Sequence, residues 1–99
     1  MEIQKILDGT TLTVKLTGRL DASNAQELTN ELNSSLGGVK SLIFDFTGLK
    51  YVASAGLRVL LTAQKRMNKQ GSMKIRNVEE SVMEVFEMTG FADLMDIEN

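Results

Sequence analysis

The stretch that decides the fold is Leu42–Gly71, which reads LIFDFTGLKYVASAGLRVLLTAQKRMNKQG. It opens with the apolar run Leu42–Phe44, which is too short for a helix and is typical of a buried strand. Thr47-Gly48 then predicts a turn, and Leu49–Val52 predicts a second short extended segment. The stretch therefore begins as strand, turn and strand.

A helix is expected after this second segment, running to about Gln70 and stopping at Gly71. Its apolar positions recur at helical spacing and are Leu57, Val59, Leu60, Leu61, Ala63 and Met67. Ser54 lies where an N-cap is needed, since its hydroxyl can accept hydrogen bonds from first-turn N–H groups. The small residues Ala55 and Gly56 leave those N–H groups accessible to an anion. Two roles for Ser54 stay open, a helix cap and a site of phosphate attachment.

Three motifs, in the same order along the chain, resemble the STAS domain family of anti-sigma factor antagonists. Asp45 followed by Tyr51-Val52-Ala53-Ser54-Ala55-Gly56-Leu57 is similar to the signature loop of that family. Gly18-Arg19-Leu20-Asp21 resembles its Gly-x-Leu-Asp turn, and Val85–Phe91 resembles its last helix with the closing glycine. The resemblance runs from Thr11 to Ile97, nearly the whole chain.

The resemblance implies a protein-binding switch. In the family, the serine that matches Ser54 is phosphorylated by a partner kinase, which is usually the anti-sigma factor itself. The unmodified domain would bind this cytoplasmic anti-sigma factor and so release a sigma factor; phosphorylation would break the complex, and a separate phosphatase would reset it. The implied partner-binding residues are Asp21, Tyr51, Ala53, Ser54, Ala55, Gly56 and Arg58, with Asp45 supporting the loop.

Ala53 departs from the family pattern, because many members carry Asp immediately before the phosphorylated serine. A carboxylate at this position could orient the hydroxyl or the loop, and alanine has no such group. The chain is therefore expected to be a phosphorylated switch, a slow kinase substrate, or a binding protein without a covalent switch.

A small-ligand or nucleotide-binding sensory module is the alternative function. The open helix start at Ser54–Leu57 could hold a phosphate without a covalent step. Arg58, on the first helical turn, opposes the helix dipole by ~0.3–1 kcal/mol, which is consistent with anion binding or with an ordinary solvated arginine.

Composition argues against several other classes of function. The chain has no cysteine and no histidine, so it lacks a thiol nucleophile, a disulfide framework, the usual general base and the commonest metal ligand. Its aspartates are scattered, Ser54 has no base partner, and there is no Walker-type loop. We therefore expect no enzyme, no catalytic residue, no metal and no cofactor.

The charge and hydropathy patterns restrict the partners. A net charge of −2 argues against a nucleic-acid partner, which would need a basic patch. No apolar run approaches the roughly 20 residues of a membrane span, and the N-terminus lacks the apolar region of a signal peptide. These patterns indicate a cytoplasmic protein without a membrane partner. The family resemblance implies bacterial signalling, and we expect a monomer.

The remaining segments predict the rest of the architecture. Ile3–Leu7 and Thr11–Leu16 flank Asp8-Gly9 and predict an antiparallel hairpin at a sheet edge. A helix should follow, capped by Ser23 with Gln26 or by Asp21, with an apolar stripe of Ala22, Ala25, Leu28, Leu32 and Leu36. Gly37-Gly38 should end this helix.

The C-terminal third predicts a strand at Ser72–Arg76 and a helix that Asn77 opens and Gly90 ends. The tail, Leu94–Ile97, should add a short strand or simply pack. The whole chain, residues 1–99, is thus one α/β domain with a small mixed sheet, an N-terminal hairpin and three to four helices mainly on one face. In its core we expect nearly full burial of Phe44, Leu57, Leu60, Leu61, Val85 and Phe86.

Overall fold

The computed structural model describes residues 1–98, so of the expected domain only the last residue lies outside the described part. The strands are β1 (Glu2–Asp8), β2 (Thr11–Leu20), β3 (Ser41–Asp45), β4 (Leu49–Val52), β5 (Ser72–Arg76) and β6 (Asp96–Glu98). The helices are α1 (Ala25–Ser35), α2 (Ser54–Gln70), α3 (Glu80–Thr89) and the short 3-10 helix η1 (Phe91–Asp93).

The sheet is mixed, as the sequence predicts. Its strand order is β1-β2-β3-β5-β6, and β4 pairs with β2 beyond the end of β3. Only the β1–β2 hairpin is antiparallel among the described strand pairs; β2–β3, β2–β4, β3–β5 and β5–β6 are parallel. The hairpin loop is Gly9-Thr10 rather than Asp8-Gly9, because Asp8 still pairs with Thr11 and Gly9 takes the positive φ of 62°.

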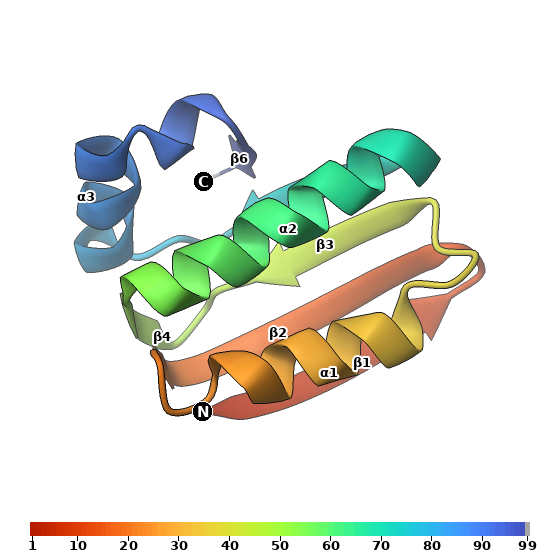
Figure 1. The fold of residues 1–99 in the computed structure, drawn as a ribbon, viewed down its shortest axis with the longest axis horizontal. Helices are drawn as coiled ribbons and strands as arrows, with labels where there is room; N and C mark the ends of the chain where they lie inside the picture. The colour runs from red at the N-terminus through yellow and green to blue at the C-terminus, as the bar shows by residue number, and fades with distance from the viewer. Residues whose placement is uncertain (99) are drawn as a thin grey trace.

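One face of the sheet carries the core. Alternating residues of β2, β3 and β5 are buried on this face: Leu12, Val14, Leu16, Leu42, Phe44, Met73 and Ile75. Helices α1 and α2 lie side by side across it, and α3 lies at one end of the sheet, next to β4 (Figure 1). The expected packing of helices mainly on one face is confirmed.

The opposite face of the sheet carries no helix (Figure 1). Its residues are mainly polar, with Ile6 and Ile43 as apolar exceptions. Across it, Lys15, Asp45, Arg76 and Glu98 stand in one register row on neighbouring strands. Their charges alternate in sign, and Arg76 Nε lies 3.2 Å from Glu98 Oε1. Opposite charges on neighbouring strands stabilise this register modestly.

Helix α1 starts later than predicted, by one residue relative to a Ser23 cap and by three relative to an Asp21 cap. Helix α1 begins at Ala25 with Asn24 as its N-cap residue, and Ala22 is exposed. Ser23 does not cap α1, because its hydroxyl donates to Asp21 Oδ1 at 2.6 Å instead. The segment before α1 is a turn that the Asp21 carboxylate organises, and this turn delays the helix.

The predicted start of the last helix is wrong for a related reason. Asn77 has a φ of 59°, which is left-handed and not helical, and α3 begins at Glu80 after the N-cap residue Glu79. Asn77 is one of the residue types that tolerate this conformation. The chain therefore turns at Asn77 before the helix starts.

Burial in the core agrees with most of the prediction. Phe44, Leu57, Leu60 and Phe86 are buried, which confirms the register of α2, whereas Leu61 and Val85 are only half-buried. Leu61 follows a buried residue by about 100° of helical rotation, so it lies at the margin of the apolar stripe. Val85 precedes the buried Phe86 by one residue, so it lies about 100° to the other side of the apolar stripe of α3.

Gly71 does end α2, but not by a left-handed turn. Its φ is 177°, and a Cβ there would lie 1.9 Å from the Lys40 carbonyl oxygen. The absence of a side chain allows a close approach of two backbone segments. The tail forms β6 at Asp96–Glu98, so of the two alternatives for Leu94–Ile97 the structure has the short strand. No helix in the described part of the chain is long and apolar enough to cross a membrane.

Candidate functional site

Two loops meet where the parallel strands β2 and β4 end. Leu20 of β2 pairs with Val52 of β4, and the Ala53 N–H donates to the Leu20 carbonyl oxygen at 2.9 Å. Since parallel strands run in the same direction, the loop that carries Asp21 and the loop that carries Ser54 leave the sheet at one edge. Figure 1 shows this edge beside the first turns of α1 and α2.

Helix α2 begins without a side-chain cap, so the predicted capping role of Ser54 is wrong. The N-cap residue is Ala53, whose backbone is extended with φ −92° and ψ 172°. Ser54 is the first helical residue, and its exposed hydroxyl forms no hydrogen bond within residues 1–98. The hydroxyl has no structural task in this fold and is accessible to a partner.

Gly56 allows α2 to approach β2 closely. It is buried, and a Cβ there would lie 2.6 Å from Leu20 Cγ and 3.2 Å from Val52 Cγ1. Of the residues expected at the partner surface, Gly56 therefore serves through its missing side chain rather than through exposed area. It keeps the start of α2 against the sheet edge.

The exposed side of this edge carries charged and aromatic groups. The Arg19 guanidinium lies 4.3 Å from the centre of the Tyr51 ring, and Arg19 Nε lies 3.9 Å from Asp21 Oδ2. Hydrogen bonds from the Ser23 hydroxyl and N–H are the main influence that lowers the pKa of Asp21 below its ordinary value. Asp21 is thus a fixed carboxylate beside the Ser54 loop.

Sequence reasoning did not predict a role for Arg19. It was visible only as the second residue of the Gly-Arg-Leu-Asp motif, and its contact with Tyr51 depends on the pairing of β2 with β4. A cation over an aromatic face contributes about 0.5–1 kcal/mol at an exposed site. This contact holds the Tyr51 ring at the surface, where it is 39% exposed.

Asp45 organises the turn that leads into β4. Its Oδ1 accepts hydrogen bonds from the Thr47 N–H at 3.0 Å, the Thr47 hydroxyl at 2.7 Å and Asn77 Nδ2 at 3.0 Å. Partial burial raises the pKa of Asp45, but the hydrogen bonds from Asn77 and Thr47 together outweigh burial and lower it. This geometry links the turn before β4 to the turn before α3.

The structure brings most of the predicted partner-binding residues to one surface. Ser54, Tyr51 and Arg58 are exposed there, and Asp21, Ala53 and Ala55 are half-buried. In the described part of the chain no three His, Cys, Asp or Glu residues are grouped so that they could hold a metal ion. The site offers an exposed hydroxyl at a helix start, beside a carboxylate and an aromatic ring.

The STAS domain family model matches residues 2–99. The chain belongs to the STAS domain family. This match agrees with the three motifs that the sequence presents in order.

Two curated relatives are similar to this chain in sequence. The proposed anti-sigma factor antagonist BtrV of Bordetella bronchiseptica is 34% identical over 86 residues, which are 85% of this chain and 74% of BtrV. The anti-sigma-B factor antagonist of Bacillus subtilis is 31% identical over 85% of this chain and 78% of its own length.

The fold is that of the Bacillus protein SpoIIAA, an anti-sigma factor antagonist. Its unphosphorylated form has a TM-score of 0.85 to this chain at 20% identity, covering 99% of this chain and 89% of SpoIIAA. Its phosphorylated form has a TM-score of 0.76 at the same identity, covering 99% and 92%. At this identity the comparison shows the shared fold, which confirms the predicted STAS-like architecture.

Proposed function

We propose that this protein is an anti-sigma factor antagonist that binds an anti-sigma factor through the Ser54 edge and is switched off by phosphorylation of Ser54. The partner is then a cytoplasmic anti-sigma factor with serine kinase activity, and a separate phosphatase reverses the modification. The protein acts as a monomer and is the substrate of phosphoryl transfer, not its catalyst.

The observation that carries this proposal is the free hydroxyl of Ser54. Ser54 caps nothing and is exposed, so its hydroxyl is accessible to a kinase and its modification disrupts no existing contact. The two curated relatives are named antagonists of anti-sigma factors, which gives the class of partner. A hydroxyl without a structural task can serve regulation alone.

The fold should tolerate a phosphate on Ser54. The modification adds about −1.5 to −2 charges at the start of α2, where the positive end of the helix dipole favours an anion. The first turn of α2 contains no acidic residue. Arg58 is four residues further along the helix, on the same side, at the spacing at which helical side chains pair.

The partner should not tolerate the phosphate. A surface that covers a neutral hydroxyl would have to bury a charge without new donors, which costs several kcal/mol. Since ~1.4 kcal/mol corresponds to a tenfold change in affinity, we expect phosphorylation to weaken binding at least about a hundredfold. Ser54→Asp should weaken it in the same direction.

The test uses candidate anti-sigma kinases from the same organism. Each is incubated with the protein and ATP, the modified site is mapped by mass spectrometry, and affinities of the free and phosphorylated forms are measured by calorimetry. Ser54→Ala should bind well and resist the kinase. Ser72→Asp is the matched control, since Ser72 is exposed at the opposite edge of the sheet.

Equal affinities of the phosphorylated and free proteins would overturn the switch. In that case a sensory module that binds a small ligand or nucleotide at the start of α2 becomes the better hypothesis. Binding of a labelled nucleotide that is lost in Arg58→Gln would support that alternative.

A further inference from the structure

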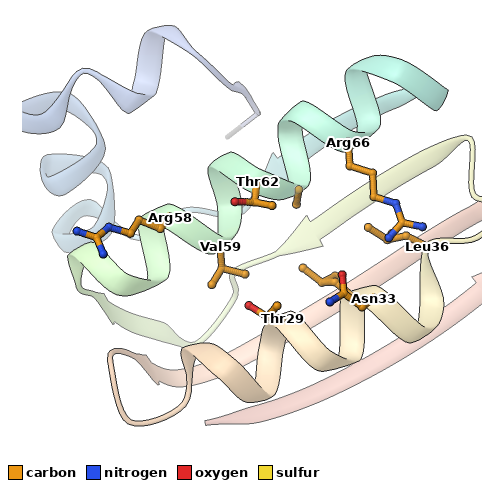
Figure 2. Close-up of a pocket in the computed structure, with 9 residues that line it drawn as sticks. Thr29, Asn33, Leu36, Arg58, Val59, Thr62 and Arg66 are labelled. Atoms are coloured by element: carbon orange, nitrogen blue, oxygen red, sulfur yellow. The ribbon is translucent and has the colours of Figure 1, made fainter.

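A groove runs between α1 and α2 on the outer side of the two helices. Its volume is about 200 Å³, and its apolar floor is formed by Leu32, Leu36, Val59 and Ala63. Figure 2 shows Thr29 and Asn33 of α1 pointing toward α2, and Arg66 reaching from α2 toward Leu36. The groove thus has an apolar floor and a polar rim.

The rim is cationic. Arg58 and Arg66 line the groove at its two ends, and neither forms an ion pair with any carboxylate of residues 1–98. Within residues 1–98, the side chain of Arg66 donates one hydrogen bond, from its Nε to the neutral Gln70 Oε1 at 3.3 Å. No acidic residue lines the groove, although α1 carries Glu27 and Glu31 elsewhere on its surface. Figure 2 shows the Arg66 guanidinium over the groove, whereas the Arg58 side chain points away from α1, toward α3. A guanidinium beside the apolar floor and a second one beyond the Ser54 end of the groove favour an occupant that is both acidic and apolar.

The dimensions favour a segment of a protein over an enclosed small molecule. Ligand pockets usually measure about 300–1,000 Å³, which is larger than this groove. Arg58 and Arg66 are eight residues apart, a separation of about 12 Å along a helix, or roughly two helical turns. Arg58 is also only one turn from Ser54, so the groove continues the surface on which the proposed partner sits.

We propose that this groove receives an acidic amphipathic segment of the anti-sigma factor, whose carboxylates pair with Arg58 and Arg66. This inference rests on the proposed function and extends its contact surface along α2. The apolar side of the segment covers Val59, the half-buried residue of the floor. The segment then binds in the groove, while the part of the partner that covers the Ser54 edge distinguishes the phosphorylated protein from the free one.

The test compares two groove variants with two matched controls. Arg66→Gln removes one rim charge, and Asn33→Glu adds a carboxylate that repels an acidic segment; each should weaken binding of the anti-sigma factor at least about tenfold. Lys69→Gln and Ser34→Glu make the same charge changes on the same helices at exposed positions outside the groove lining. These controls should change affinity less than about twofold.

Salt dependence gives a second measurement that a merely structural role would not change. Wild-type binding should weaken with ionic strength more steeply than binding of Arg66→Gln, because one charge pair is missing in the variant. Thermal unfolding of all four variants should match wild type. Ser54→Asp should still weaken binding in the Arg66→Gln background, because phosphorylation is read at the other end.

The outcomes separate the two proposals. If no anti-sigma factor binds the wild-type protein, the proposed function and this inference both fail. If the wild-type protein binds but the groove variants behave like their controls, the function stands and the inference is wrong. Concentration-dependent self-association that Arg66→Gln abolishes, with partner affinity unchanged, would also overturn it by assigning the groove to a second copy.

Discussion

The starts of α2 and α3 are held in place by different groups, by the backbone at α2 and by side chains at α3. Both helices follow an extended N-cap residue without a side-chain cap, and both carry a serine in the first turn. At α3 the side chains are occupied: Lys50 Nζ contacts Glu79 Oε1 at 2.7 Å, and the Ser81 hydroxyl donates to the Lys50 carbonyl oxygen at 3.1 Å. At α2 the backbone does the positioning, through the hydrogen bond from Ala53 to Leu20.

This difference shows how a surface stays available for a partner. Where backbone hydrogen bonds and a close glycine contact fix the helix, exposed side chains have no structural task and can change their chemistry without loss of the fold. Where side chains fix the helix, the same changes would break contacts. The following predictions test this contrast, from the largest expected effect to the smallest.

Gly56→Ala should destabilise the protein by about 1–3 kcal/mol, because the new Cβ would overlap the buried side chain of Leu20. Helix propensity alone predicts the opposite result, a gain in stability of about 0.5–1 kcal/mol for Gly→Ala. Chemical denaturation decides between them. A more stable variant would show that packing against β2 does not position α2.

Asp45→Asn should destabilise the turn that leads to α3 by about 1.5 kcal/mol at neutral pH, because hydrogen bonds to a charged acceptor weaken. The pKa of Asp45 is lowered in the folded protein, so its contribution is present above its ordinary value of 3.8 and is lost as the pH falls through the folded pKa. The difference in stability between the two proteins should therefore stay constant above about pH 4 and shrink as the pH falls further. A difference that stays constant below that pH would contradict the charge-based explanation.

Ala53→Asp should stabilise the protein by about 1 kcal/mol, because Ala53 holds the N-cap position and Asp is a good cap. Ala55→Asp is the matched control, since it adds the same charge in the first turn without reaching the cap position. If the carboxylate also orients Ser54, the phosphorylation rate rises while partner affinity stays almost unchanged. Equal melting temperatures for Ala53→Asp and wild type would place the helix start elsewhere.

Ser81→Ala should cost about 0.5–1 kcal/mol, since the Lys50 carbonyl oxygen loses a hydrogen bond. Ser54→Ala should change stability by less than about 0.5 kcal/mol, as expected for a surface side chain without partners. Thermal unfolding of the two variants measures the contrast directly. A larger loss for Ser54→Ala would restore its capping role.

Much of the architecture followed from local pattern. The alternation of Leu12, Val14 and Leu16 predicted a half-buried strand, and the spacing from Leu57 to Met67 predicted the buried face of α2. These predictions succeeded because burial of a periodic apolar face dominates the energetics of strands and helices. The motifs around Asp21 and Ser54 were also sufficient to indicate the family.

Only the tertiary structure decided which side chains at this edge are free. The pairing of β4 with β2 places the extended conformation at Ala53, one residue before the serine that local sequence rules select as the cap. The same pairing brings Arg19 to Tyr51, a contact between residues that are far apart in the sequence. Propensity rules describe neighbours along the chain, whereas the task left to Ser54 depends on hydrogen bonds that another strand supplies.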